Sequence, residues 1–258
     1  MRGAMSNESH GESPIERIVL AFGDAVPQGN VVTVAAALAR GLEVSLAALL
    51  VEDERLLRLA DFPAAREIGF TSACLRPFGR EEMERAWRAQ ARRARRLIGR
   101  VADSFALSWS MEVVRGNLLR AALERSAPGE PVVLWRGTRL APATEWEMSA
   151  ARTAGTSGTV AVAVLPNAGP AGERALRAAQ VIAQVTGGAP VLRVQDRVAI
   201  DTDALNTRGE RIAEITAQAV TRQLRTERVG LVVVAREALA DSVIEACERL
   251  GCPICVVA

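Results

Sequence analysis

Short, uninterrupted apolar runs alternate with amphipathic stretches along most of this chain, and that alternation restricts the folds open to it. The first run is RIVLAF at residues 17–22, similar runs recur at 43–51 and 131–135, and a further strand, WSMEVVR, is predicted at 109–115. A strand that is apolar on both faces needs cover on both sides, which a parallel sheet between two layers of helices provides. We therefore expect an α/β fold with a doubly wound parallel sheet.

Helical periodicity fills the intervals between these runs. Residues 30–41 repeat apolar side chains at helical spacing and end at a glycine, which predicts a helix there. The longest helix is predicted over 80–105, and a further helix follows Gly116. Between 53 and 79 the pattern is irregular and predicts only a short helix at 56–60.

The strand and helix pattern restarts after residue 156. Strands are predicted at 159–165, 190–194, 229–235 and 253–257. Helices are predicted between them, starting at Pro170, at a capping box that begins at Thr207, and at Leu239. We interpret the restart as an internal duplication whose second copy is shortened.

This interpretation divides the chain into three parts. Residues 1–14 are polar and are predicted to be disordered. Residues 15–157 form the first domain, which includes a linker at 138–157, and residues 158–258 form the second. Because the short second copy cannot easily cover its own sheet, we expect the copies to pack together as an internal pseudo-dimer, through their final strands or the faces beside them. A homodimer of two chains is the alternative assembly.

The residue types present argue against catalysis. The chain has no Lys and no Tyr, and its only histidine is His10 in the polar N-terminal segment. Without Lys, neither a Walker A phosphate site nor Schiff-base chemistry can be built. We assign no catalytic residue, and we expect a binding protein rather than an enzyme, with weak ATP hydrolysis left open.

Charge and hydropathy limit the partners. The 32 basic and 30 acidic residues give a net charge of +2, which offers no general reason to expect nucleic acid. The polar start lacks the apolar segment of a signal peptide, and no apolar run approaches the ~20 residues that cross a bilayer. We therefore expect a cytoplasmic protein that does not enter a membrane.

The order of these elements resembles the universal stress protein family. In the first copy the resemblance rests on RIVLAFGDAVPQGN and MEVVRGNLLRAALERSAPGEPVVLWRG. In the second it rests on GERALRAAQVIAQVTGGAPVLRV and GLVVVAREALADSVIEACERLGCPICVV. The resemblance implies two tandem flavodoxin- or Rossmann-like domains, of the type shared with adenine nucleotide alpha hydrolases, and a role in stress response through binding a ligand or partner.

ATP-binding members of this family carry an Asp after the first strand and a glycine motif after the fourth. Here Asp24 lies near the first position and Gly137 matches the first glycine, but Leu140 and Ala150 stand where further glycines belong. Gly155 and Thr156 match the glycine and hydroxyl residue that close this motif only if the loop before them contains an insertion. The resemblance thus implies a degenerate nucleotide site. We expect no bound cofactor, with ATP as the alternative.

Polar residues follow the predicted strands at their carboxyl ends, where open α/β sheets bind ligands. In the first copy they are Asp24, Glu52, Asp53, Arg115 and Arg136; in the second they are Asn167, Asp196 and Arg236. Solvent contact at strand ends explains the same pattern without a ligand. The candidate binding residues are therefore Asp24, Glu52, Arg115, Gly137, Gly155 and Thr156.

The cysteines give a weaker signal. Cys252 and Cys255 have the Cys-x-x-Cys spacing, but they enter an apolar strand rather than a helix N-terminus, where a thiolate is stabilised. No second pair and no usable histidine completes a zinc site. We interpret these cysteines as small core residues and assign no metal.

One predicted helix carries a dense basic surface, made of Arg85, Arg88, Arg92, Arg93, Arg95, Arg96 and Arg100. A solvated helix face explains this surface, and so does a docking site for an acidic partner. Three hypotheses follow: a non-enzymatic stress-response protein that binds a ligand or partner, an ATP-binding protein with a remodelled loop, and an adaptor for an acidic protein.

Overall fold

The computed structural model describes most of the first half of the chain and separate segments of the second. The described residues are 15–23, 25–62, 64–68, 73–127, 129–136, 161–165, 170–185, 191–193, 229–241, 243–244, 247 and 252–257. The predicted disorder at 1–14, the linker at 138–157 and the helix predicted from Thr207 lie outside them.

The strands of the first half are parallel neighbours, as predicted. They are β1 (Arg17–Phe22), β2 (Ser45–Glu52), β5 (Trp109–Arg115) and β6 (Val132–Trp135), in the order β5-β2-β1-β6. All three pairings are parallel, so the carboxyl ends of these strands meet at one edge of the sheet. We call this the first carboxyl edge.

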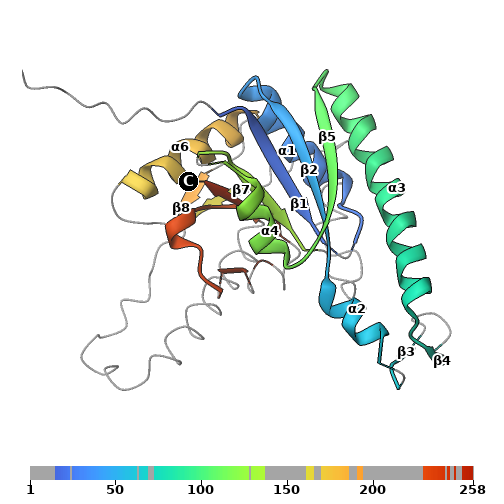
Figure 1. Ribbon diagram of the computed structural model, residues 1–258. Helices are drawn as coiled ribbons and strands as arrows, with labels where there is room; N and C mark the ends of the chain where they lie inside the picture. Colours follow the sequence, from blue (N-terminus) through green and yellow to red (C-terminus); the bar gives the residue numbers. More distant parts are fainter. Residues whose placement is uncertain are drawn as a thin grey trace, which may run out of the picture.

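Helices cover both faces of this half-sheet (Figure 1). α1 (Gly29–Gly41) and α3 (Arg80–Ser104) lie on one face, and α4 (Leu118–Arg125) lies on the other. The apolar stripes of α1 and α3 point to the sheet, since Leu38 of α1 and Ile98 of α3 belong to the core on this face, while Trp87 in the first half of α3 packs against Leu57 of α2. Near the first carboxyl edge, Gln90 Nε2 of α3 donates a hydrogen bond to the Gly23 carbonyl at 2.7 Å.

The stretch after β2 contains more structure than the sequence predicted. α2 (Glu54–Ala60) agrees with the short helix, but β3 (Arg66–Ile68) and β4 (Leu75–Pro77) form an antiparallel hairpin in the region interpreted as irregular. Three-residue strands are too short to show a period in sequence. The hairpin lies beside α2, away from the main sheet (Figure 1).

The described strands of the second half are also parallel to one another. They are β7 (Ala161–Val164), β8 (Val191–Arg193), β9 (Val229–Ala235) and β10 (Ile254–Val257), in the order β10-β9-β7-β8. α6 (Pro170–Val185) packs on them, and the short η2 (Arg236–Ala238) follows β9. Asp241, Val243, Ile244 and Cys247 are helical, in agreement with the last predicted helix.

The two half-sheets join through their final strands, as the sequence analysis predicted. β6 pairs with β10, so that Leu134 lies opposite Ile254 and the eight described strands form one continuous sheet. This pair is antiparallel, so the expectation of a wholly parallel sheet is wrong at this seam. Because the halves run in opposite directions, the carboxyl ends of the second-half strands lie at the opposite edge from the first carboxyl edge.

One apolar core crosses the seam. On the face of α1 and α6, a single cluster of buried residues includes Ile18 and Val31 from the first half and Val162 and Ile182 from the second. α1 packs directly against α6. The halves therefore share a core, while their assignment as two duplicated domains stays an interpretation.

Candidate functional site at the first carboxyl edge

Two of the predicted binding residues meet at the first carboxyl edge. Glu52 ends β2 and Arg115 ends β5, and the two residues are opposite each other in the sheet register. Arg115 Nε lies 3.1 Å from Glu52 Oε2, and Arg115 Nη2 lies 3.9 Å from Glu84 Oε1 of α3. The structure thus places this pair of charges where the sequence predicted a rim.

The other predicted binding residues lie outside the described part of the chain. These are Asp24, Gly137, Gly155 and Thr156, and the same holds for Asn167 and Asp196. Arg236 follows β9 and therefore lies at the opposite edge of the sheet from Arg115. The prediction that polar residues of both halves line one rim is therefore wrong for Arg236.

A polar cavity of about 480 Å³ lies beside Arg115, between the start of α2 and the turn from β5 to α4. We call it the outer cavity. Its charged lining consists of the arginines and carboxylates Arg55, Arg58, Arg115, Arg120, Asp53, Glu54 and Glu124. Basic groups exceed acidic ones in this lining, so the cavity favours an anion over a cation.

Asp53 is held ionised at the mouth of this cavity. It is the N-cap of α2, and its Oδ1 accepts hydrogen bonds from the Arg55 amide at 2.9 Å and from Arg55 Nε at 3.2 Å. Burial raises the pKa of Asp53, but the two Arg55 hydrogen bonds and the charges of Arg55 and Arg136 outweigh burial and hold the pKa below its usual value. Arg55 is thereby engaged within the protein.

Arg120 also has an ion-pair partner within the protein, whereas no such partner is seen for Arg58 among the described residues. Arg120 Nε lies 2.7 Å from Glu124 Oε1, one helical turn further along α4. Within the described residues, Arg58 has no ion pair, and its side chain is exposed in the cavity wall. Arg58 is therefore the lining guanidinium most available to a ligand.

The turn from β5 to α4 shapes the floor of the outer cavity. Gly116 has φ +149°, a backbone conformation that side chains disfavour. Asn117 follows as the N-cap of α4, and its Oδ1 accepts a hydrogen bond from the Arg120 amide at 3.1 Å. The sequence Gly-Asn before an apolar helix signals this turn, yet sequence reasoning selected neither Asn117 nor Arg58 as a site residue.

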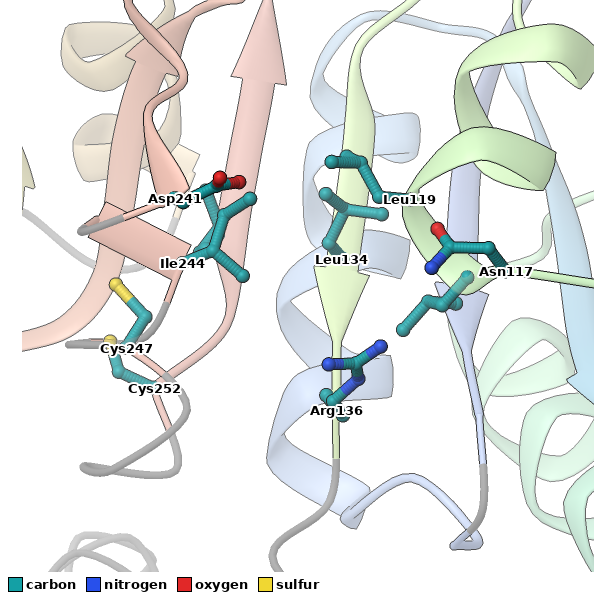
Figure 2. Close-up of a pocket in the computed structure, with 10 residues that line it drawn as sticks. Asn117, Leu119, Leu134, Arg136, Asp241, Ile244, Cys247 and Cys252 are labelled. Carbon is teal, nitrogen blue, oxygen red and sulfur yellow. The ribbon is translucent and has the colours of Figure 1, made fainter. Parts of the chain in front are cut away.

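A second cavity, of about 160 Å³, lies at the seam between the two halves. We call it the inner cavity. Leu119 of α4 and Leu134 of β6 line one wall, and helical Ile244 lines the other (Figure 2). Arg136 and Asp241 are its charged residues, and Asn117 lines both cavities. Sequence reasoning found Arg136 as a rim residue but missed this cavity, because its walls come from opposite halves of the chain.

The Cys-x-x-Cys spacing does not bring its two thiols together. Cys252 belongs to the core cluster on the α4 face of the sheet, and Cys255 belongs to the cluster on the α1 face. Burial raises the pKa of Cys255 to about 12, and burial together with Cys247 raises the pKa of Cys252 well above its usual value. Across the described residues, no group of three metal-ligating side chains forms.

α3 lies at the outer side of the molecule (Figure 1), and its arginines are exposed. Arg88 pairs weakly with Glu84 at 3.9 Å, and Arg95 Nη2 donates to the Met111 carbonyl at 3.5 Å. We define the arginine face as the exposed arginines of α3 for which the described residues show neither an ion pair nor a side-chain hydrogen bond: Arg92, Arg93, Arg96 and Arg100. No helix among the described residues is long and apolar enough to cross a membrane.

Comparison with solved structures finds a similarity in fold. A universal stress protein from Archaeoglobus fulgidus DSM 4304 matches with a TM-score of 0.44 and 10% sequence identity, over 93% of this chain and 95% of that one. No family model matches the chain, and no curated protein matches it in sequence. Similarity at this level does not establish a family, so function has to be argued from the site.

Proposed function

We propose that this protein is a non-enzymatic binding protein that holds a small anionic ligand in the outer cavity. The observation that carries the proposal is the excess of arginine over carboxylate in a cavity at the first carboxyl edge. Open α/β sheets bind their ligands at this kind of edge. A guanidinium presents several donors in a plane, which suits carboxylate and phosphate oxygens.

The regulatory, stress-response role belongs to the same proposal. This role is supported by the resemblance of the order of predicted elements to that of the universal stress protein family. It is also supported by the scarcity of catalytic residue types, since the chain has no Lys, no Tyr and one His. In this role the ligand changes the stability or the contacts of the protein and leaves unaltered.

A binding assay on the whole chain tests the proposal. Thermal unfolding is followed with inorganic phosphate, citrate and magnesium ATP at millimolar concentration, and with adenosine as an uncharged control. We expect one or more anions to raise the melting temperature while adenosine does not, because a ligand that binds only the folded state stabilises it. If no anion shifts the melting temperature, the proposal is rejected.

Arg58→Gln locates the site. Because Arg58 has no described ion pair, its loss should weaken anion binding about tenfold, the effect of one charged hydrogen bond, without lowering the stability of the unliganded protein. Arg100→Gln on α3 is the matched control and should bind as the unmodified protein does. Equal affinities in both variants would show that the anion binds elsewhere.

Magnesium ATP is the alternative ligand, held by Asp24, Gly137, Gly155 and Thr156. The same titration separates this alternative from the outer cavity. If ATP binds with an affinity that Arg58→Gln leaves unchanged and Gly155→Ala with Thr156→Ala abolishes, the nucleotide belongs to the loop. Recovery of the ATP unhydrolysed supports a binding role over an enzymatic one.

A second candidate function is docking of an acidic protein segment on the arginine face. The favouring observation is that the four arginines of this face are exposed and have no ion-pair partner in the described chain. Like charges held close together are stabilised by a partner of opposite sign. Reversing charge at Arg92→Glu and Arg96→Glu should abolish capture of an acidic partner, while Arg40→Glu on α1 should not. Capture that survives the double reversal removes this candidate.

A further inference from the structure

Two thiols line the same wall of the inner cavity. Cys247 is helical and Cys252 lies two residues before β10, and both side chains lie on one side of the cavity (Figure 2). They are buried, with exposed fractions of 1% and 8%, and neither is in a disulfide bond. Both residues therefore border the inner cavity.

A backbone hydrogen bond fixes the separation of these two residues. The Cys252 amide donates to the Cys247 carbonyl at 2.9 Å. Covalent geometry then limits the distance between the two Cα atoms to at most about 7 Å, and disulfides join Cα atoms that are roughly 4.4 to 6.8 Å apart. A bond from residue i+5 back to residue i is also the bond that closes many helix ends, where the two side chains involved are in contact.

Electrostatics agrees with this proximity. A thiolate at Cys247 disfavours ionisation of Cys252, which is one cause of the raised pKa of Cys252. Cys255 does not compete for the same partner, because it is buried on the other face of the sheet. Cys74 is exposed on the surface.

We propose that Cys247 and Cys252 are a reversible disulfide site in the wall of the inner cavity, oxidised by a low-molecular-weight disulfide such as glutathione disulfide. One protein thiolate attacks a sulfur of glutathione disulfide, forms a mixed disulfide and releases one glutathione thiolate. The second protein thiol, after losing its proton, attacks the mixed disulfide and releases the second glutathione. The two protein sulfurs are oxidised by two electrons, and glutathione disulfide is reduced to two thiols.

The proposal is independent of the anion site. Oxidation would tie the helical residue Cys247 to the segment just before β10, next to the seam between β6 and β10. The bond would therefore alter the wall of the inner cavity without touching Arg58 or the outer cavity.

A peptide map of the whole protein tests this assignment. The full chain is incubated with glutathione disulfide, the remaining thiols are alkylated in denaturant, and trypsin cuts after arginine. Cys247 then lies in the peptide 237–249, while Cys252 and Cys255 share the peptide 250–258. We expect these peptides to be joined with the loss of two hydrogen atoms, and fragmentation to place the bond on Cys252. Reduction with dithiothreitol should separate them.

Two controls make the result decisive. Glutathione on the exposed Cys74 reports that the oxidant was active, and Cys255→Ala should leave the cross-link in place. A bond within 250–258 would overturn the proposal, because it would join Cys252 to Cys255. Modification of Cys74 with Cys247 and Cys252 both recovered as alkylated thiols would overturn it as well.

Discussion

Arg17 clamps the carboxylate of Glu130 at the start of β1. Arg17 Nε lies 2.9 Å from one carboxylate oxygen and 3.1 Å from the other, and the Glu130 side chain is only 5% exposed. The Ala127 amide donates to the same carboxylate at 2.7 Å, and Arg17 also donates to the Arg125 carbonyl at 2.8 Å. This cluster joins β1 to the connection between α4 and β6.

Arg17→Ala should lower the free energy of unfolding by about 2 kcal/mol, because it leaves a buried carboxylate without its cation. Chemical denaturation measures the loss. Arg40→Ala, which removes an exposed arginine from α1, is the matched control and should cost less than about 0.5 kcal/mol. Equal losses in the two variants would mean that the Arg17–Glu130 pair does not stabilise the fold.

Gly116→Ala should destabilise the protein by about 1 to 3 kcal/mol, through backbone strain at φ +149° rather than through a clash, since nothing lies within 4 Å of an added Cβ. The variant should also weaken anion binding, because Gly116 lines the outer cavity. Gly29→Ala is the control: it has the same open space at the start of α1, so its stability should rise by less than about 1 kcal/mol. Thermal unfolding of both variants measures the two changes in stability. A loss in Gly116→Ala without a loss in Gly29→Ala indicates backbone strain at residue 116.

Stability should fall as pH rises above about 9. Burial raises the pKa of Cys255 from 9.0 to about 12, so the unfolded chain loses this proton first and the folded state is disfavoured between those values. Each such thiol lowers the free energy of unfolding by up to about 1.4 kcal/mol per pH unit. The chain has no Lys and no Tyr to obscure this window.

Denaturation at a series of pH values from 8 to 11 gives the slope. Cys255→Ala should make the slope shallower, even though the variant starts less stable. A slope that Cys255→Ala does not alter would assign the alkaline loss to other groups.

Residues 158–258 expressed alone should be insoluble or poorly folded. In the whole chain, β10 pairs with β6 and α6 packs against α1, so the fragment would expose an apolar strand edge and the face of α6. Solubility and a melting curve decide the matter. A monomeric fragment that melts cooperatively would show that the halves fold independently.

Local elements of this fold were predictable from sequence because their signals are local. The runs at 17–22, 109–115 and 229–235 agree with β1, β5 and β9 residue for residue. The runs RIVLAF and VGLVVVA are apolar except for Arg17 at the first position, so the apolar stretch and the strand have the same bounds. The third run, WSMEVVR, ends at the charged Arg115 just before Gly116. The contact of the final strands was also predictable, since the second half has too little apolar surface of its own.

The direction of that contact and the two cavities were not predictable. A strand reads the same whether its neighbour is parallel or antiparallel, so nothing in the residues near Leu134 or Ile254 signals the antiparallel seam. Glu52 and Arg115 were found because each ends a predicted strand. Arg58 and Cys247 were missed as site residues because their importance depends on residues distant in sequence, on α4 and β10.

β10 lies in the middle of the sheet, between β6 and β9, although it follows both of them in the chain. A chain that is synthesised from its amino terminus therefore holds β6 and β9 with unpaired strand edges until β10 emerges from the ribosome. A change that removed β10 would open the centre of the sheet rather than shorten its edge.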